Sequence, residues 1–407
     1  MTTKALVAAV LAICGCDSNQ SGNVGSTKLG DTSHPAARRS PLEEVQQACG
    51  APGALLGATT AIQRRPYLQE VTTSSAVVGW VTNAPTGQTL EITGPDGRVV
   101  TSSLAAPESG DTRAAGEQQM WTNVEGLQPD TIYCYRVMLD GQPASERIGF
   151  RTAPSADSTR TIGILAFGDS GGGTTDQLQL RSQMDDVPYE LIIHTGDLAY
   201  ESGSLDQLES TVFDVYDDLF RHIPFFPASG NHDYKTLGGA PFRAVFKLPE
   251  NGNAEKWYSY DWGRIHFAAL DTEADYDTQM AWLDADLAAT KLPWKIVYMH
   301  RPPYSSGNHG SDTSLRNKLA PVVERHHVQL VLTGHDHTYE RMIPQNGVAY
   351  VVTGGGGRGT YTVGQSSFTA FSESVIHYSY LEVGVDQLVL HAIDAEGTEF
   401  DSLVVAR

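Results

Sequence analysis

The stretch VQLVLTGHDH, residues 328–337, places an apolar run directly before two histidines. Residues 328–333 have the composition of a buried β-strand, so we expect the chain to leave the sheet at Gly334. In extended backbone, side chains two residues apart point to the same side, which aims His335 and His337 at one place. Such a pair is typical of a metal site or a proton-transfer site, although a polar loop can also hold two histidines by chance.

Four more apolar runs end in polar residues in the same way. They are TIGILAF, ELIIHT, PFFPAS and WKIVYM, which lead into Asp169, into Asp197 and Tyr200, into Asn231, and into His300. Helix-like stretches with apolar residues three and four positions apart lie between these runs. The alternation predicts an α/β domain over residues 160–407. Its polar residues are expected at the carboxyl ends of the strands, where open α/β sheets place their sites.

The region before this domain has a different pattern. Residues 61–153 contain short β-like runs, such as AVVGWVT and TIYCYRVML, separated by the turns APTG, GPDG and LDGQ. This pattern predicts a small antiparallel sandwich of the fibronectin type III kind. Its sequence shows no convergent group of His, Asp and Glu residues, so we expect a structural or positioning role for it.

Residues 1–16 are expected to be a signal peptide, because one lysine precedes an apolar run that is too short to span a bilayer. The following Cys-Gly-Cys resembles the bacterial lipoprotein box, in which Cys16 would carry the lipid; an ordinary cleaved signal is the alternative. Residues 17–60, rich in Ser, Gly, Thr, Ala and Pro, are predicted to form a flexible tether. We therefore expect an exported protein, either periplasmic, held at the cell surface as a lipoprotein, or secreted.

The chain has 28 basic and 48 acidic side chains and a net charge of −20. Nucleic acid is not an expected partner, because its binding requires basic patches. A site for a small anionic substrate would need local positive charge of its own. Cys49 and Cys134 remain in the body of the chain, where an oxidising compartment permits a bridge between them. The sequence favours the other interpretation, in which Cys134 is a small buried apolar residue.

The order of the polar motifs resembles that of a known family. Asp-x-Gly, Gly-Asp-x-x-Tyr, Gly-Asn-His-Asp, a single His and Gly-His-x-His follow one another as in the purple acid phosphatases of the calcineurin-like metallophosphoesterase superfamily. The stretch RPYLQEVTTSSAVVGW resembles the N-terminal domain of the plant-type, two-domain members. The resemblance implies an all-β sandwich followed by a metallophosphoesterase domain, itself a β-sandwich flanked by helices. It also implies an acid phosphatase in which a metal-bound hydroxide attacks small phosphate monoesters.

The resemblance further implies a centre of two metal ions. The first ion would be held by hard ligands that suit Fe(III), namely Asp169, Asp197, Tyr200 and His337. The second would be held by ligands that suit divalent Zn, Fe or Mn, namely the bridging Asp197 with Asn231, His300 and His335. Most relatives in the superfamily have Asp-x-His in the first motif. Here Gly171 stands in place of that histidine, and the phenolate of Tyr200 would restore the ligand. Three ligand negative charges against five positive ones leave about +2 for an anionic substrate.

Two histidines outside the ligand sets are expected to contact the substrate. His232 would bind phosphate or protonate the leaving alkoxide, and His309 would assist it. The plant-type enzymes have two adjacent histidines at the second position, whereas Gly310 follows His309 here, so the leaving-group contacts are expected to differ. Arg358 is a candidate for substrate contact. His194 and His266 are expected to be core histidines with satisfied hydrogen bonds.

Three other functions fit parts of the sequence. A phosphodiesterase would use the same two-metal site and differ in the walls of the pocket. The residues GDSGG also fit the G-x-S-x-G pattern of serine hydrolases, with Ser170 as the nucleophile, but this leaves the polar ends of the other strands unexplained. A non-catalytic surface-binding module would be expected to have lost ligands, and every ligand position is filled.

Overall fold

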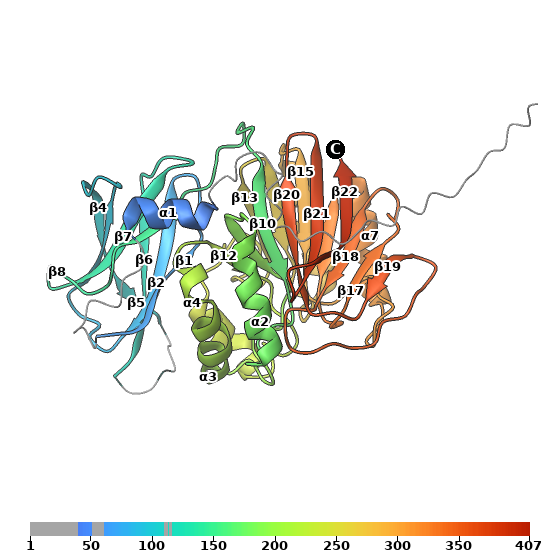
Figure 1. Cartoon of the computed structure of the whole chain (residues 1–407), viewed down its shortest axis with the longest axis horizontal. Helices are drawn as coiled ribbons and strands as arrows, with labels where there is room; N and C mark the ends of the chain where they lie inside the picture. The colour runs from blue at the N-terminus through green and yellow to red at the C-terminus, as the bar shows by residue number, and fades with distance from the viewer. Residues whose placement is uncertain (1–39, 51–60, 110–112, 114–115) are drawn as a thin grey trace, which may run out of the picture.

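The computed structural model describes residues 40–50, 61–109, 113 and 116–407. An N-terminal β-rich part lies at one end of the molecule, and two larger sheets with helices make up the rest (Figure 1). The predicted signal peptide, the lipid on Cys16 and most of the predicted tether lie outside the described residues. Among those that are described, no helix is long and apolar enough to cross a membrane.

The N-terminal part is a sandwich of two antiparallel sheets, as the sequence predicts. One sheet has the order β1 (Ile62–Gln69), β2 (Ser75–Thr82), β6 (Gln118–Glu125), β5 (Ala106–Pro107). The other has the order β4 (Val99–Leu104), β3 (Gln88–Thr93), β7 (Ile132–Leu139), β8 (Gln142–Pro143), with β9 (Ile148–Arg151) also paired to β7. Alternate residues of facing strands, such as Val78, Trp80, Leu90 and Ile92, are fully buried between the sheets.

The predicted tether is wrong for residues 41–49, which form the helix α1 (Pro41–Cys49) on the sandwich. Ser40 and Glu43 form a capping box at its start, and Val45 and Cys49 are its buried residues. Cys49 is joined to Cys134 of β7 by a disulfide with a Cα–Cα distance of 5.6 Å. The prediction that Cys134 is an unpaired buried residue is therefore wrong. The Ser- and Gly-rich composition of the surrounding sequence obscures this short helix, whose buried face is only two residues wide.

The C-terminal part contains two large mixed sheets. The first has the order β12 (Phe225–Pro227), β11 (Leu191–His194), β10 (Ile162–Phe167), β20 (His377–Val383), β21 (Gln387–Asp394), β22 (Glu399–Ala406). The second has the order β13 (Tyr258–Trp262), β14 (Ile265–Ala269), β15 (Trp294–Tyr298), β16 (Leu330–Thr333), β18 (Ala349–Thr353), β17 (Tyr339–Met342), β19 (Thr369–Glu373). The strands that precede the polar motifs run parallel to their neighbours, β10 to β11 to β12 and β15 to β16.

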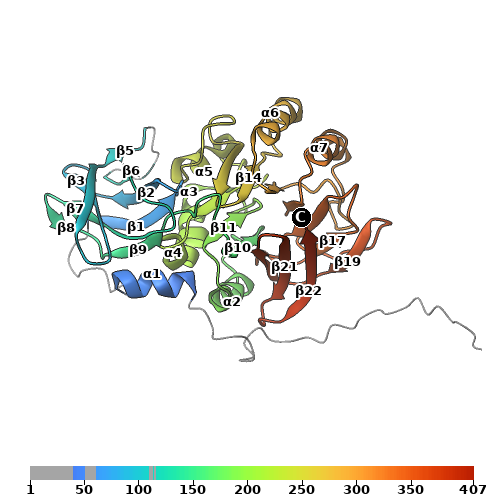
Figure 2. The same ribbon diagram turned by 90° about the horizontal axis from the view of Figure 1, so that it is seen from above.

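Helices cover the outer faces of these sheets (Figure 2). The described helices of this part are α2 (Thr175–Gln183), α3 (Leu205–Leu208), α4 (Asp214–Phe220), α5 (Ala240–Val245), α6 (Tyr276–Ala289) and α7 (Thr313–Arg325), with short helical turns η1 (Met184–Asp186), η2 (Glu209–Phe213) and η3 (Leu237–Gly239). Asp275 and Asp312 cap the starts of α6 and α7 with their side chains. The fold is thus the predicted β-sandwich flanked by helices.

Alternation along the strands divides the core into two clusters. Ile296 and Tyr298 of β15 face the other sheet, while Val297 between them faces α6 and α7 and packs with Leu283 and Leu319 of these helices. A strand with two buried faces needs this continuous apolar sequence, which explains the WKIVYM run. Burial of each such side chain stabilises the fold by about 1.5–3 kcal/mol. The strand ends are therefore held rigidly where the polar motifs begin.

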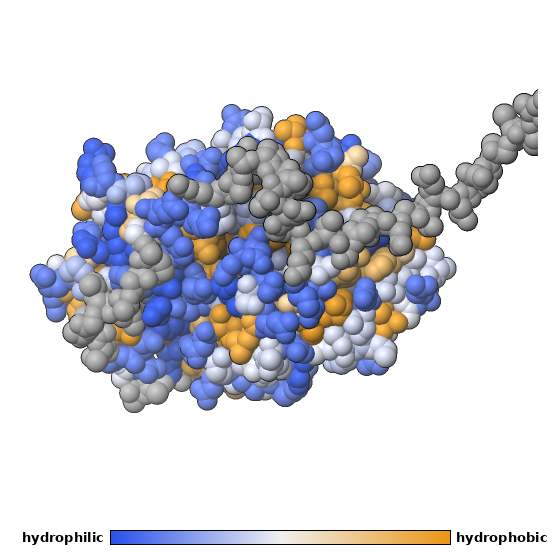
Figure 3. Space-filling view, viewed as in Figure 1, coloured by the Kyte–Doolittle hydropathy of each residue, from blue (hydrophilic) through white to orange (hydrophobic). Residues whose placement is uncertain are grey.

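The sandwich and the C-terminal part share an extensive interface. The larger core cluster continues from one to the other. Arg221 at the end of α4 forms a buried ion pair with Glu146 of the sandwich at 2.6 Å, and the hydroxyl of Tyr135 donates to the carbonyl of Arg221 at 2.7 Å. On the face shown in Figure 3, apolar residues lie in small groups separated by hydrophilic ones. The sandwich is therefore held against the C-terminal part by a shared core, an ion pair and a hydrogen bond. The positioning role expected from the sequence would use these contacts.

Candidate metal centre

The polar residues that follow five strands meet where the two large sheets face each other. Three strands of the six-stranded sheet lead into Asp169, Asp197 with Tyr200, and Asn231, and two strands of the seven-stranded sheet lead into His300, and into His335 with His337. The strand pattern alone predicts one sheet edge, whereas the ligands come from the edges of two sheets, in agreement with the β-sandwich that the family resemblance implies. Asp169, Asp197 and His335 have left-handed backbones, with φ of 58°, 55° and 71°. Such strained conformations at non-glycine residues cluster at functional sites.

One group of predicted ligands surrounds the hydroxyl of Tyr200. This oxygen lies 3.0 Å from Asp169 Oδ1, 3.1 Å from Asp197 Oδ2 and 3.0 Å from His337 Nε2. His337 Nε2 is also 3.5 Å from Asp169 Oδ1. All four side chains are buried. The structure thus brings together the residues predicted to hold the first ion.

The second group surrounds His300 Nε2. This nitrogen lies 3.2 Å from Asp197 Oδ2, 3.2 Å from Asn231 Oδ1 and 3.1 Å from His335 Nδ1. Donor atoms of Asp197, His300 and His335 all lie within 4.8 Å of one another. Asp197 Oδ2 belongs to both groups, as a bridging ligand must. These are the residues predicted for the second ion, and they also meet in the structure.

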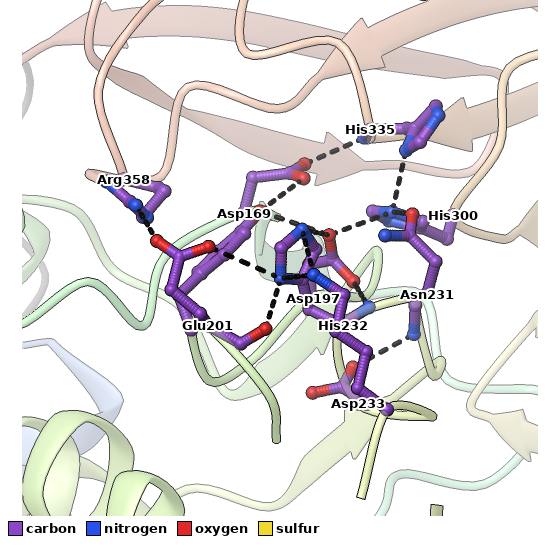
Figure 4. A network of polar contacts seen from close by, with 12 residues as sticks. Asp169, Asp197, Glu201, Asn231, His232, Asp233, His300, His335 and Arg358 are labelled. Carbon is purple, nitrogen blue, oxygen red and sulfur yellow. Dashed lines mark hydrogen bonds and ion pairs between the residues drawn. The ribbon is translucent and has the colours of Figure 1, made fainter. Parts of the chain in front are cut away.

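Neighbouring groups orient these side chains (Figure 4). His300 Nδ1 donates to the carbonyl of Thr195 at 3.0 Å, which leaves Nε2 as the free ring nitrogen facing Asp197. The backbone N–H of His335 donates to Asp169 Oδ2 at 2.8 Å, and that of His232 donates to Asp197 Oδ1 at 2.7 Å. Each carboxylate therefore keeps one oxygen for the protein and aims the other at the centre.

Burial and close charges shift the pKa values of the side chains in the centre. Burial and the carboxylates of Asp169 and Asp197 raise the pKa of Tyr200 well above its usual value. Burial opposes ionisation of Asp197, but His300 and His232 outweigh it and lower its pKa. Burial would lower the pKa of His300, but Asp197 and Asp169 raise it to about 9. A cation bound here would favour the ionised hydroxyl of Tyr200 and the neutral ring of His300, because metal ligands bind in these forms.

The donor set fits metal ions. Asp169 is fully buried and Asp197 is 2% exposed, and within the described part of the chain no lysine or arginine side chain forms an ion pair with either. Two buried carboxylates this close together need a compensating charge. Burial, together with His300, His309 and Arg301, lowers the pKa of His335 to about 2, so its ring is neutral and suited to ligation.

The local structure explains why Tyr200 replaces a histidine. A Cβ atom at Gly171 would lie 1.6 Å from the carbonyl oxygen of Leu198, so no side chain fits at this position. The backbone N–H of Tyr200 donates to the carbonyl of Gly171 at 2.9 Å, which places the two residues side by side. Tyr200 then projects into the space beside Asp169. The absence of a side chain at Gly171 and the position of the Tyr200 ring thus depend on the same close contact between the two loops.

The two predicted substrate histidines lie at the open side of the centre. His232 Nδ1 donates to the carbonyl of Glu201 at 2.7 Å, and its Nε2 lies 3.9 Å from Asp197 Oδ2. The exposed His309 stacks on His335, with ring centroids 4.2 Å apart. Arg358 pairs with Glu201 and lies over the ring of Tyr200 at 5.0 Å, so it is also beside the centre. The structure brings all three to the site.

Ser170 does not have the geometry of a nucleophile. It is 1% exposed, and its Oγ lies 2.9 Å from His194 Nε2. His194 Nδ1 accepts the N–H of Gly196 at 3.1 Å, so the proton of the neutral ring is on Nε2 and is donated to the serine. Burial and His300 lower the pKa of His194 to about 3, which keeps the ring neutral. A base that already donates to the serine cannot accept its proton.

Several residues near the site have no assigned role from sequence. Lys235 Nζ lies 3.0 Å from His232 Nδ1, and Arg301 Nη1 lies 3.2 Å from His335 Nε2. Asp233 is buried and accepts the N–H groups of Leu198 and Gly230, which ties two ligand loops together. Asp336 accepts the N–H of His309 at 2.7 Å. Asp233 and Asp336 belong to the sequence motifs GNHD and GHDH, which also contain predicted ligands. Membership in these motifs is the only sequence feature that could have indicated a role for them at the site.

The comparisons with known proteins agree with this geometry. A model of the calcineurin-like phosphoesterases matches residues 162–339, and a model of the purple acid phosphatase N-terminal domain matches residues 63–152. The chain belongs to the purple acid phosphatase family. The second model lies within the sandwich, and the first covers the C-terminal part up to residue 339, including all seven predicted metal ligands.

Individual relatives support the same assignment. Purple acid phosphatase 23 of Arabidopsis thaliana is 28% identical over 281 residues, which are 58% of this chain and 61% of that protein. A nucleotide pyrophosphatase/phosphodiesterase of Hordeum vulgare is 25% identical over 335 residues, 63% of this chain and 86% of that protein. A solved purple acid phosphatase from yellow lupin seeds has the same fold, with a TM-score of 0.76, 21% identity, and coverage of 84% of this chain and 74% of that one. The share of the curated relative that the match spans differs between them, from 43% to 86%, and is 60% for an uncharacterised protein of Mycobacterium tuberculosis.

Proposed function

We propose that this protein is a binuclear-metal acid phosphatase that hydrolyses small phosphate monoesters. The observation that carries the proposal is the pair of donor groups that share Asp197 Oδ2, one around Tyr200 and one around His300. A carboxylate shared in this way could hold two ions close together, as two-metal hydrolysis of phosphoesters requires. A protein that had lost this activity would not be expected to keep both groups in contact.

The two groups suit different ions. Asp169, Asp197 and Tyr200 offer hard anionic oxygens, with His337 beside them, and we assign Fe(III) to this group. His300, His335 and Asn231 offer imidazole nitrogens and an amide oxygen beside Asp197, and we assign a divalent Zn, Fe or Mn ion to this group. When bound, such ions would activate water at neutral pH and stabilise the charge on phosphoryl oxygens.

The side chains around the centre would bind and orient the substrate. Lys235, Arg301 and Arg358 lie around it, and their donor groups could contact phosphoryl oxygens. Arg301 also pairs with Glu273, and Arg358 pairs with Glu201. The carbonyl of Glu201 holds His232 Nδ1–H, so Nε2 faces the open side of Asp197, where it can contact a phosphoryl oxygen or the leaving alcohol. His309 on the opposite loop would contact the same substrate from the side of His335.

Export of the protein is part of the proposal. Disulfides persist in oxidising compartments and are rare in the reducing cytosol. The bond between Cys49 and Cys134 therefore supports the interpretation of residues 1–16 as a signal peptide, with or without lipid on Cys16.

The phosphodiesterase function remains the second candidate, because the relative from Hordeum vulgare has the printed name of a nucleotide pyrophosphatase/phosphodiesterase. Release of nitrophenol from nitrophenyl phosphate and from bis-nitrophenyl phosphate, with and without a strong chelator, separates the two functions. We expect chelator-sensitive turnover that favours the monoester. A preference for the diester would leave the metal centre in place and move the function to phosphodiesterase. Turnover that resists the chelator would contradict the metal mechanism itself.

The assignment of iron is tested with Tyr200→Phe. The variant keeps the ring that contacts those of His232 and His337, and it removes only the hydroxyl. We expect the iron-loaded wild-type protein to have a visible absorption band from iron and phenolate, and the variant to lack it while its circular dichroism is unchanged. Tyr276→Phe, which removes a hydroxyl bonded to Asp312 instead, is the control and should keep the band. A band that persists in Tyr200→Phe would contradict the ligand assignment.

A further inference from the structure

Tyr361 is an aromatic residue at the centre that no predicted role includes. Its ring stacks on that of His337, with centroids 4.1 Å apart and planes inclined by 11°. It meets the ring of His309 edge to face, with centroids 5.5 Å apart. Tyr361 thus fills the space between a ligand of the first ion and the histidine on the opposite loop.

The loop that carries Tyr361 is fixed to the residues of the centre. The N–H of Tyr361 donates to the carbonyl of His337, and that of Arg358 donates to the carbonyl of Asp169, both at 3.0 Å. The N–H of Gly356 donates to the carbonyl of Gly168 at 2.9 Å, an approach so close that a Cβ at Gly356 would lie 2.2 Å from that oxygen. Figure 4 shows Arg358, three residues before Tyr361, reaching to Glu201 beside the centre. The ring position is therefore set before any substrate binds.

The hydroxyl of Tyr361 is available to a ligand. Tyr361 is only partly buried, and within the described part of the chain its hydroxyl forms no hydrogen bond. By contrast, the hydroxyls of Tyr200, Tyr276 and Tyr339 each bond to a carboxylate. A tyrosine hydroxyl ordinarily carries its proton at neutral pH and can donate a hydrogen bond.

We propose that Tyr361 donates a hydrogen bond to the oxygen of the leaving alcohol. This inference rests on the proposed phosphatase function. His309 contacts the rings of both His335 and Tyr361, and Gly310 after it has no side chain, so the Tyr361 hydroxyl is a donor beside His309 that has no partner among the described residues. The bond strengthens as negative charge develops on the departing oxygen, which makes Tyr361 a determinant of which alcohols leave fast.

The test compares Tyr361→Phe with the wild type on two monoesters, nitrophenyl phosphate and ethyl phosphate. The phenyl ring keeps the stacking on His337, so metal content and folding should not change. We expect kcat on ethyl phosphate, whose leaving group is basic, to fall about tenfold or more, because a hydrogen bond to a charged oxygen is worth that much. On nitrophenyl phosphate, whose leaving group needs no help, kcat should change less than about twofold. KM should change little for both.

Tyr304→Phe is the matched control. Tyr304 is also partly buried, its hydroxyl has no hydrogen-bond partner within the described residues, and its ring packs against Tyr350 and Phe368 instead of the ligand histidines. This variant should behave as the wild type on both esters. An active wild type with equal effects of Tyr361→Phe on the two esters, or no effect on either, would overturn the inference alone. A metal-loaded wild type that hydrolyses neither ester would overturn the proposed function and the inference together.

Discussion

Replacing Asp197 by asparagine is expected to remove both metal ions and to lower phosphatase activity by at least about a thousandfold. Asp197 Oδ2 lies 3.1 Å from the hydroxyl of Tyr200 and 3.2 Å from His300 Nε2, so one oxygen serves both donor groups. An amide in its place presents a neutral group to two cations, and the first group keeps only Asp169 as a carboxylate. Metal analysis of the purified variant, reconstituted beside the wild type, measures the loss directly.

The asparagine variant should still fold. Asp197 Oδ1 accepts the N–H of His232, and the amide oxygen of asparagine can accept the same bond. The buried charge of Asp197 disappears with the substitution, which removes a desolvation cost. Asp176→Asn is a suitable control, because Asp176 is exposed in the first turn of α2 and removes the same charge away from the site. Full metal content in Asp197→Asn would contradict the bridging role, whatever the activity.

The strand ends explain why so much of the centre follows from sequence. Each predicted ligand comes directly after an apolar run, and such a run is rigid once both faces of its strand are buried. The position of each residue directly after its apolar run thus fixes where it lies relative to its own strand, as for Asp169, Asn231 and His300. The strand pattern alone does not show that the five strands belong to two sheets, because strand pairing is set by contacts between distant segments; the two-sheet arrangement came from the resemblance to a family. The resemblance to a family supplied the grouping of ligands.

Residues that reach the site from loops were harder to predict. Tyr361 lies in the stretch RGTYTVG, which has no periodicity, and its place against His337 depends on backbone bonds from three separate loop residues. Arg301 directly follows the ligand His300, and Lys235 stands four positions after Asn231, but neither position shows that the side chain turns towards the centre. The closed space at Gly171 also depends on Leu198, a residue of another loop. Contacts between loops are set by the tertiary structure, and a single sequence holds little record of them.

The helix α1 and its disulfide depend on the same kind of distant contact. Cys49 and Cys134 are separated by 85 positions, and nothing local in either segment indicates the other. The helix packs closely on β9, where a Cβ at Gly149 would lie 2.3 Å from the carbonyl of Val45. An ion pair between Glu44 and Arg151, at 2.6 Å, adds a further contact. A helix of nine residues would be marginal in water without these contacts.

Removing this disulfide by replacing Cys49 and Cys134 with alanine is expected to lower the free energy of unfolding of the sandwich by about 2–5 kcal/mol. A bond that closes a loop of this length restricts the unfolded chain, and the two alanines also remove buried sulfur atoms. Urea unfolding measures the change. Hydrogen exchange in α1 should become faster at the same time, because the helix loses its covalent link to β7 and its ion pair with Arg151 is partly exposed.

The effect of the same double substitution on the metal centre should be small. The disulfide joins α1 to β7 inside the sandwich, whereas the ligands stand on strands of the two C-terminal sheets. The interface between the two parts rests on other contacts, among them the ion pair of Arg221 with Glu146. We therefore expect metal content and kcat at 25 °C to remain within about twofold of the wild type, since distant sites behave independently. A peptide digest of the unreduced wild type that yields Cys49 and Cys134 as separate thiols would contradict the disulfide. Loss of metal in the double variant would show instead that the sandwich positions the centre through this bond.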